Sequence, residues 1–148
     1  MRSVIERVSQ ASVSIDGTVH ATIGKGLLIL LGIETEDIPE DVEWLVQKLT
    51  AMRIFSDAEG KMNASLADVS GELLIISQFT LLASTKKGNR PGFTRSARPE
   101  QAIPLYEDFI QRCSMAVPVQ TGIFGADMQV SLINDGPVTI VIDSKNRE

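Results

Sequence analysis

Residues 27–49 read LLILLGIETEDIPEDVEWLVQKL, and this stretch predicts a strand followed by a helix. The run from Leu27 to Ile33 is short and continuously apolar, which is typical of a strand buried on both faces. Asp37 offers a capping side chain for the helix, with Pro39 and Glu40 in its first turn. Apolar residues then recur at intervals of three and four, so that they share one helix face: Val42, Leu45, Val46 and Leu49.

The segments on either side continue this mixture of strands and helices. Residues 12–15 and 18–23 alternate polar and apolar side chains around Asp16-Gly17, a sequence that favours a two-residue hairpin turn. The whole pattern predicts a layered α/β domain. Beyond residue 49 we expect a strand at 53–55, a polar turn at 57–61, a buried strand at 73–81, a basic loop at 83–98, a helix from Pro99 with Ile103, Tyr106, Phe109, Ile110 and Cys113 on one face, strands at 117–119 and 128–133, a turn at 134–137 and a final strand at 138–142.

Length and composition are typical of one globular domain. The chain has 148 residues, of which 43% are hydrophobic, so we expect a single domain over residues 1–148. The start MRSVIE carries an acid where a signal peptide would be apolar, and the longest apolar run is far shorter than the ~20 residues that span a bilayer. We therefore expect a soluble cytoplasmic protein without a membrane partner.

The balance of charge is acidic, with 14 Lys+Arg against 19 Asp+Glu and a net charge of −5. This argues against a general nucleic-acid coat, and we expect no DNA partner. One stretch of thirteen residues is nevertheless basic and contains no acid. A solvated loop and a phosphate-contacting edge explain this stretch equally well. Its basic residues are Lys86, Lys87, Arg90, Arg95 and Arg98.

The usual catalytic residue types are scarce. His20 is the only histidine and lies in the hairpin, where we expect a surface or core role. Cys113 is the only cysteine, which excludes an internal disulfide, and its place on the helix stripe favours a buried structural thiol. One histidine and one cysteine cannot form a typical zinc site, so no metal and no cofactor are expected.

Two short segments stand out from the apolar pattern. Ser77-Gln78-Phe79-Thr80 places polar side chains at the end of a hydrophobic strand, where sites occur in layered α/β folds. Ordinary hydrogen-bonded polar residues at a strand end remain the alternative. Asn134-Asp135-Gly136-Pro137 interrupts a second apolar run, and its Gly-Pro bond can belong to a plain turn or be a cis peptide.

Together these segments resemble the paired signature of the D-aminoacyl-tRNA deacylases, also called D-tyrosyl-tRNA deacylases. The signature comprises residues 77–81 and 134–139 in the expected order. The resemblance covers essentially the whole chain. Further similar segments are residues 1–8, 24–27, 53–55, 60–63, 87–91 and 122–128.

The resemblance implies a dimeric α/β fold, with a single layered domain of mixed, largely antiparallel sheets and two main helices. It also implies hydrolysis of the ester between a D-amino acid and the terminal adenosine of tRNA, in sites at a homodimer interface. Whether the glycyl ester is also cleaved, and which D-amino acids are preferred, stays open. The implied pocket residues are Ser77, Gln78, Phe79 and Thr80, with Ala102 and Phe124 near the adenosine, Gly136 and cis Pro137 inserted from the partner subunit to meet the substrate amino group, and Arg7 holding the Gly-Pro segment.

The scarcity of catalytic residues agrees with the mechanism that the resemblance implies. Ester cleavage without a histidine or metal must rest on positioning, on backbone donors and on groups of the substrate itself. The resemblance implies that backbone N–H groups around Phe79 and Thr80 stabilise the oxyanion and that the 2′-hydroxyl of the terminal ribose helps to activate the water. Thr80 as a covalent nucleophile is the older alternative, and no base is available to activate it. Two other functions stay open: an esterase with a Ser or Thr nucleophile, and a tRNA-binding module without catalysis. For tRNA phosphates the candidate contacts are Lys86, Lys87 and Arg90.

Overall fold

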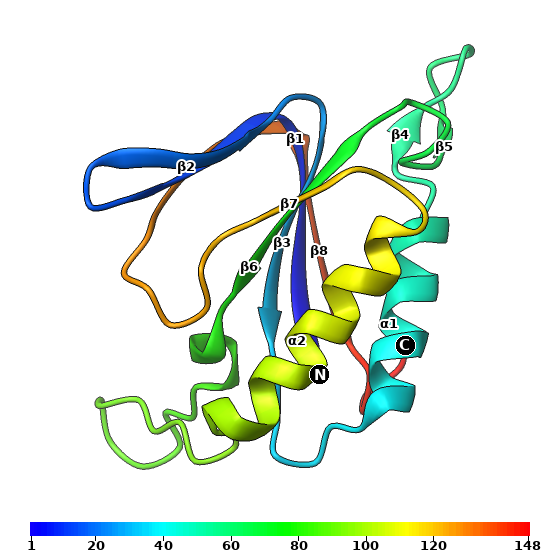
Figure 1. Ribbon diagram of the computed structural model, residues 1–148. Coiled ribbons are helices and arrows are strands. Elements are labelled where there is room, and N and C mark those ends of the chain that lie inside the picture. The colour runs from blue at the N-terminus through cyan, green and yellow to red at the C-terminus, as the bar shows by residue number, and fades with distance from the viewer.

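The computed structural model describes residues 1–148, with two helices packed side by side against one face of a six-stranded sheet (Figure 1). This confirms the expected mixed α/β layers. No helix is long and apolar enough to cross a membrane. The elements are β1 (Arg2–Ile15), β2 (Thr18–Ile23), β3 (Gly26–Gly32), α1 (Pro39–Ala51), β4 (Phe55–Ser56), β5 (Met62–Ala64), β6 (Glu72–Ser77), the 3₁₀ turn η1 (Phe79–Leu82), α2 (Pro99–Ser114), β7 (Val119–Thr121) and β8 (Gln129–Asp143).

The long strand β1 organises the sheet. It pairs antiparallel with β2 and β3 along one edge and with β8 along the other. Strand β3 then pairs in parallel with β6, and β6 in parallel with β7. The sheet is therefore antiparallel around β1 and parallel around β6, and β8 forms an outer edge.

Side chains alternate along β3, so both faces of this strand are buried as its apolar run predicts. Leu27 and Ile29 join the main core beneath the two helices. Leu28 points to the opposite face, where it packs with Leu74 and Ile76 of β6 in a second, smaller core. Strands β3 and β6 pair in parallel, so their carboxyl ends lie at the same edge of the sheet.

The start of α1 differs from the prediction. Asp37 does not cap the helix, because its carboxylate accepts hydrogen bonds from the Met1 amino group and from the Glu34 N–H. The carboxylate of Asp41, in the first turn, accepts from the Ile38 N–H at 3.0 Å instead. The Met1 amino group, which is distant in sequence, thus binds the Asp37 side chain that the local sequence predicted as the helix cap.

The buried face of α2 is also shifted from the prediction. Tyr106, Phe109 and Cys113 are buried as expected, whereas Ile103 and Ile110 are only half-buried. Ala102 and Leu105 take their place in the core, because α2 packs against α1 as well as against the sheet.

Two turns near the ends of strands follow their local sequence. Asp16 and Gly17 both have positive φ, 51° and 77°, which confirms the predicted hairpin turn between β1 and β2. The predicted turn at 57–61 is also present, and Asp57 Oδ1 accepts hydrogen bonds at 2.9 Å from the N–H groups of Glu59 and Lys61. It joins β4 to β5, a short strand that the sequence pattern did not indicate.

Two expectations about strand ends are wrong. The strand expected at 73–81 stops at Ser77, because the Gln78 N–H makes the last bond to β3, to the Leu31 carbonyl at 2.7 Å, and η1 follows. The turn expected at 134–137 is not a reversal. Strand β8 continues through it, since Glu6 pairs with Thr139 and Val8 with Asn134, and residues 135–138 bulge out opposite Arg7.

Candidate active site

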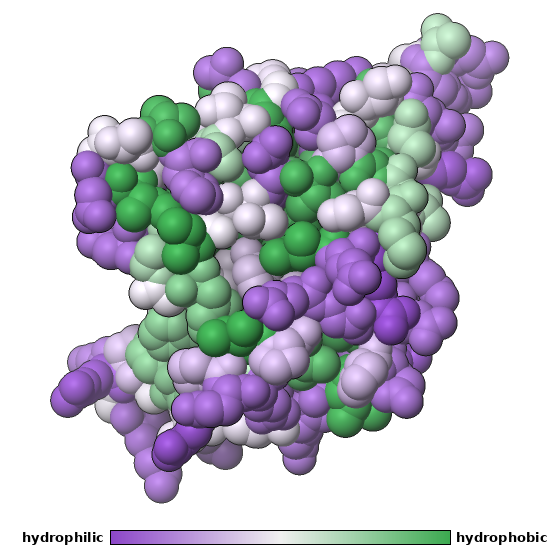
Figure 2. Space-filling model, viewed as in Figure 1, coloured by the Kyte–Doolittle hydropathy of each residue, from purple (hydrophilic) through white to green (hydrophobic).

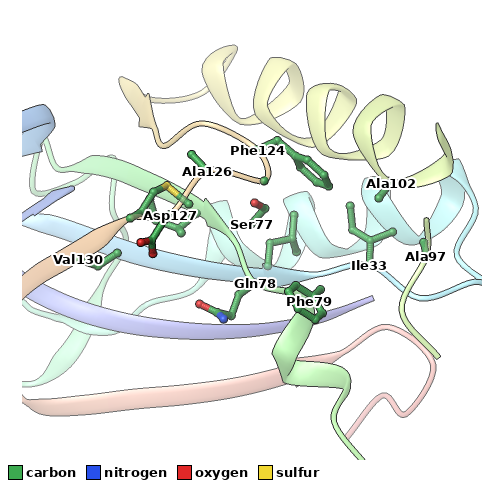
Figure 3. A pocket seen from close by; sticks show the side chains of 14 residues that line it. Ile33, Ser77, Gln78, Phe79, Ala97, Ala102, Phe124, Ala126, Asp127 and Val130 are labelled. Atoms are coloured by element: carbon green, nitrogen blue, oxygen red, sulfur yellow. The ribbon is translucent and has the colours of Figure 1, made fainter. Parts of the chain in front are cut away.

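A pocket of about 290 Å³ lies at the carboxyl ends of the parallel strands β3 and β6 (Figure 3). This is the edge at which ligands bind in sheets of this kind. Its lining is mostly apolar, and polar side chains come from Ser77, Gln78 and Asp127. The other lining residues are Leu31, Ile33, Ile76, Phe79, Ala97, Ala102, Phe124, Gly125, Ala126, Met128 and Val130.

Most of the first signature segment faces this pocket. Ser77, Gln78 and Phe79 line it at the junction of β6 and η1. Thr80 follows in the turn and is exposed, and its hydroxyl accepts a hydrogen bond from the Gln78 amide. The polar cluster thus lies at the end of the strand, as the sequence indicates, but on a helical turn rather than on an extended strand.

Ala102 and Phe124 lie across the pocket from the signature segment (Figure 3). The Phe124 ring packs against Tyr106, with ring centroids 5.6 Å apart at 59°. The Tyr106 hydroxyl donates to the Ile75 carbonyl at 3.0 Å, and burial raises the pKa of Tyr106 to about 12. Tyr106 is therefore a protonated, fixed support that sets the position of Phe124.

One wall of the pocket was missed in the sequence because it joins two segments that are distant along the chain. Ile33 and Ala97 both line the pocket, and the Ala97 N–H donates to the Ile33 carbonyl at 2.9 Å. Beside them Arg95 donates to the carboxylate of Glu34 at 2.6 Å, and this bond raises the pKa of Arg95. Glu34 is only 3% exposed, so the pair fixes the wall from behind.

The second signature segment lies outside the pocket of its own chain. Gly136 and Pro137 are exposed on the β8 bulge and are joined by a cis peptide. Arg7 stands behind them, donating to the Asp135 carbonyl at 2.8 Å and to the Ile54 carbonyl at 2.6 Å. The Asn134 carboxamide closes the base of the bulge, because its oxygen accepts from the Val138 N–H at 2.7 Å.

The basic loop lies beside η1, and hydrophilic side chains cover it at the lower left of Figure 2. Ser84 and Gly92 close the loop with backbone hydrogen bonds of 2.8 and 2.9 Å. Lys86, Lys87 and Arg90 are exposed between them, and none has a carboxylate within 4.0 Å. These side chains do not line the pocket.

The remaining candidates lie apart from the pocket. His20 is exposed on β2. Cys113 is buried in α2, where burial raises the pKa of its thiol to about 12, so the interpretation as a buried structural thiol is confirmed. No group of three or more His, Cys, Asp or Glu side chains is placed to hold a metal ion.

This chain is similar to known proteins along its whole length. The family model described as D-Tyr-tRNA(Tyr) deacylase matches residues 4–143. Proteins named D-aminoacyl-tRNA deacylase from Cytophaga hutchinsonii and Akkermansia muciniphila are 63% and 62% identical, over 100% of this chain and of theirs.

Solved structures show the same fold. One described as c-Myc DNA Unwinding Element Binding Protein is 39% identical, with a TM-score of 0.92 over 97% of this chain and 98% of the other. A probable eukaryotic D-amino acid tRNA deacylase, 17% identical, superposes with a TM-score of 0.80 over 95% and 97% of the two chains. With a family model matched along nearly its whole length and relatives above 60% identity, the chain belongs to the D-Tyr-tRNA(Tyr) deacylase family.

Proposed function

We propose that this protein hydrolyses the ester between a D-amino acid and the terminal adenosine of tRNA, as one deacylase domain formed by residues 1–148. The observation that carries the proposal is the pocket at the ends of β3 and β6, because residues 77–79 of the family signature line it. Its mostly apolar lining suits an amino-acid side chain or a nucleobase. Such an enzyme removes the D-amino acid from mischarged tRNA and so keeps D-amino acids out of translation in the cytoplasm.

The chemistry rests on positioning and on backbone donors. The first N–H groups of a helical turn have no partner within that turn, and in η1 these belong to Phe79 and Thr80. Donors of this kind stabilise the oxyanion that forms when water attacks an ester. The substrate supplies the remaining group, since its ribose 2′-hydroxyl lies next to the ester and assists the attacking water. No cofactor is needed for this route.

The pocket is completed by a second copy of the chain. Gly136 and Pro137 are exposed and lie outside the pocket of their own chain, so a homodimer is required to bring them to the substrate amino group. Strand β8 suits such an interface, because it is an outer edge with large exposed apolar side chains. These side chains are Leu132, Ile133 and Val141.

The rest of the tRNA is held by charge. Lys86, Lys87 and Arg90 are exposed and unpaired in a chain of net charge −5, and they contact tRNA phosphates. Because the remaining surface is acidic, duplex DNA is not expected to bind tightly. Competition of tRNA binding by duplex DNA measures this directly.

A deacylation assay on D-tyrosyl-tRNA, L-tyrosyl-tRNA and glycyl-tRNA tests the proposed activity. We expect release of D-tyrosine with the L-ester left intact, and the glycyl ester measures whether an achiral substrate is accepted. Binding of tRNA without cleavage of the D-ester would favour a tRNA-binding module. An acyl group trapped on Ser77 or Thr80 would favour a nucleophilic esterase.

A further inference from the structure

A pair of aromatic rings, one exposed and one half-buried, flanks the pocket. Phe79 lines the pocket, and 56% of its surface is exposed. The rings of Phe79 and Phe93 pack edge to face, with their centroids 5.0 Å apart and an interplanar angle of 72°. Phe93 does not line the pocket, so the pair extends outward from its wall.

The backbone holds both rings in place. Phe93 directly follows Gly92, whose N–H and carbonyl are both bonded to Ser84, and the Phe93 carbonyl accepts from the Ser96 N–H at 3.0 Å. The Ser96 hydroxyl donates in turn to the Phe79 carbonyl at 3.3 Å. The two aromatic residues therefore belong to one hydrogen-bonded unit, and a ligand can stack on them without first ordering a loop.

The charges next to this pair favour a polyanion. Phe93 lies on the same loop as Lys86, Lys87 and Arg90, which are exposed and have no acidic partner. Apolar surface adjoins the hydrophilic loop in Figure 2. Phe79 is exposed and Phe93 keeps part of its surface accessible. Accessible aromatic surface beside unpaired cations is the combination that binds single-stranded nucleic acid, because bases stack on the rings while phosphates contact the cations.

We propose that Phe93, together with the exposed part of Phe79, forms a stacking subsite for the nucleobase that precedes the esterified terminal nucleotide of the RNA. This rests on the proposed function, since it takes the pocket as the place of the terminal aminoacyl-adenosine. The strand then leaves the pocket past Phe79, stacks one base on the aromatic pair and runs on toward the basic loop.

Substrates of different length test the subsite. The D-tyrosyl ester of adenosine alone reaches only the pocket, whereas the same ester on a trinucleotide ending in adenosine also reaches the aromatic pair. We expect Phe93→Ala to lower kcat/KM for the trinucleotide ester about tenfold, which is ~1.4 kcal/mol and lies in the range for one stacked base. The nucleoside ester should be cleaved as by the unaltered protein.

Two matched variants separate stacking from packing. Phe93→Leu keeps the apolar contact but has no aromatic face, so it should resemble Phe93→Ala, and Phe93→Tyr should retain the full rate. A trinucleotide ester with an abasic site before the terminal adenosine should lose the same tenfold with the unaltered protein and nothing further with Phe93→Ala.

Several outcomes would overturn the subsite: full activity of Phe93→Leu, equal losses on both esters, or unchanged cleavage of the abasic substrate. A changed oligomeric state of Phe93→Ala in sedimentation would assign the ring to a protein interface instead. Binding of the unesterified trinucleotide, with and without its middle base, is measured in parallel. This binding needs no hydrolysis, so it tests the subsite even if the protein does not cleave the esters. A lack of cleavage would contradict only the proposed function.

Discussion

In η1, next to the pocket-lining residues 77–79, the hydroxyl of Thr80 is paired with a group that cannot activate it. Its hydrogen-bond partner is the Gln78 amide nitrogen, which donates and has no basic lone pair. A nucleophilic hydroxyl needs an adjacent base, and the only histidine, His20, lies on β2 rather than in the pocket. The residue geometry therefore favours Thr80 as a positioning group.

Replacement of Thr80 by alanine is expected to leave substantial deacylase activity. Loss of one positioning hydrogen bond costs about 1–2 kcal/mol, which is roughly a tenfold fall in rate. Loss of a true nucleophile lowers the rate by several powers of ten. Single-turnover rates on D-tyrosyl-tRNA measure the difference, with Thr80→Ser as the control. An inactive Thr80→Ala protein that still folds and binds tRNA would restore the nucleophile model.

Among the elements, β8 carries the feature that most directly concerns the proposed reaction. A strand that pairs along nearly all of β1 still lifts residues 135–138 away from the sheet. Arg7 spans this gap and connects the bulge to the segment before β4 through two backbone carbonyls. The bulge is thus a braced projection of the sheet, suited to contact another molecule.

We expect Arg7→Met to lower deacylase activity more than it lowers stability. The substitution keeps an unbranched stem but removes both hydrogen bonds to the carbonyls of Asp135 and Ile54, so the Gly136-Pro137 segment loses its support. Hydrogen bonds from a charged donor contribute about 1.5–3 kcal/mol each, so urea unfolding should reveal some destabilisation as well. Arg53→Met, at an exposed arginine with no ion pair, is the matched control. Equal activity of the two variants would remove Arg7 from the proposed site.

The basic loop is the second element with a measurable role. Each phosphate contact contributes about 0.7–0.9 to the slope of log K against log salt, so three contacts contribute about 2 to 3. Replacing Lys86, Lys87 and Arg90 by glutamine in one triple variant should weaken tRNA binding uniformly across tRNA sequences. The slope of log K against log salt should become smaller by about 2 to 3. Lys61→Gln, at a lysine paired with Glu59, should leave the slope as it is. The same slope in the triple variant would mean that the loop is only solvated surface.

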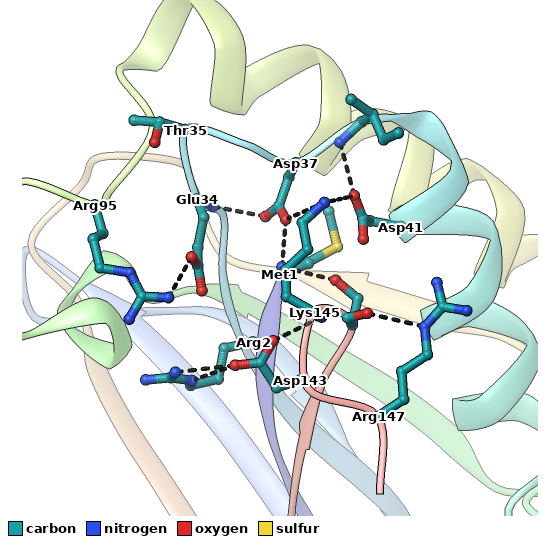
Figure 4. A network of polar contacts seen from close by, with 12 residues as sticks. Met1, Arg2, Glu34, Thr35, Asp37, Asp41, Arg95, Asp143, Lys145 and Arg147 are labelled. Carbon is teal, nitrogen blue, oxygen red and sulfur yellow. Dashed lines mark hydrogen bonds and ion pairs between the residues drawn. The ribbon is translucent and has the colours of Figure 1, made fainter.

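Across the whole molecule, a polar network joins the two ends of the chain to the start of α1 (Figure 4). The buried Met1 amino group donates to Asp37 and to the Ser144 hydroxyl, the latter at 2.9 Å. Next to it Lys145 donates to Asp41 at 2.7 Å. Strand β1, helix α1 and the segment after β8 are therefore fixed to one another at this end of the sheet.

This network predicts a pH-dependent loss of stability. Burial alone would raise the pKa of Asp41, but hydrogen bonds from Lys145 and the Ile38 N–H outweigh it and hold the pKa below its ordinary value of 3.8. A carboxylate with a lowered folded pKa stabilises the protein above pH 3.8, and this contribution disappears as the pH falls through the folded pKa.

The corresponding variant is Lys145→Met. It should destabilise the protein by about 1 kcal/mol at pH 7, and its difference from the unaltered protein should vanish well below pH 3.8. Urea unfolding at both pH values checks this, with Lys61→Met of the exposed Glu59 pair as the control. A difference that persists at low pH would assign the effect to packing of the lysine chain.

Assembly is the remaining question at this scale. If Gly136 and Pro137 complete the pocket of a second copy, the active protein must be a dimer. Sedimentation at assay concentration should therefore give about twice the chain mass of 16.1 kDa. Charged substitutions at two exposed residues of the open edge, Ile133→Lys and Val141→Lys, should shift the protein to monomer and reduce activity in parallel. An active monomer would contradict the proposed assembly.

Elements that depend on residues close together in the chain could be predicted from the sequence. The Asp16-Gly17 hairpin follows from the backbone preference of two residues, and the burial of β3 on both faces follows from an unbroken apolar run. The sequence also predicted the buried apolar part of β6, although not its end at Ser77. These features depend on neighbours a few residues apart, which periodicity and composition describe well.

Tertiary structure decided which distant segments meet. Asp37 does not cap α1, because its carboxylate accepts a hydrogen bond from the Met1 amino group instead. Strand β8 continues past its expected turn, because it pairs with β1 on both sides of residues 135–138. The pocket wall of Ile33 and Ala97 likewise exists only because two remote segments share a hydrogen bond. Such pairings depend on the competition among all segments for the same partners, and no local pattern carries that information.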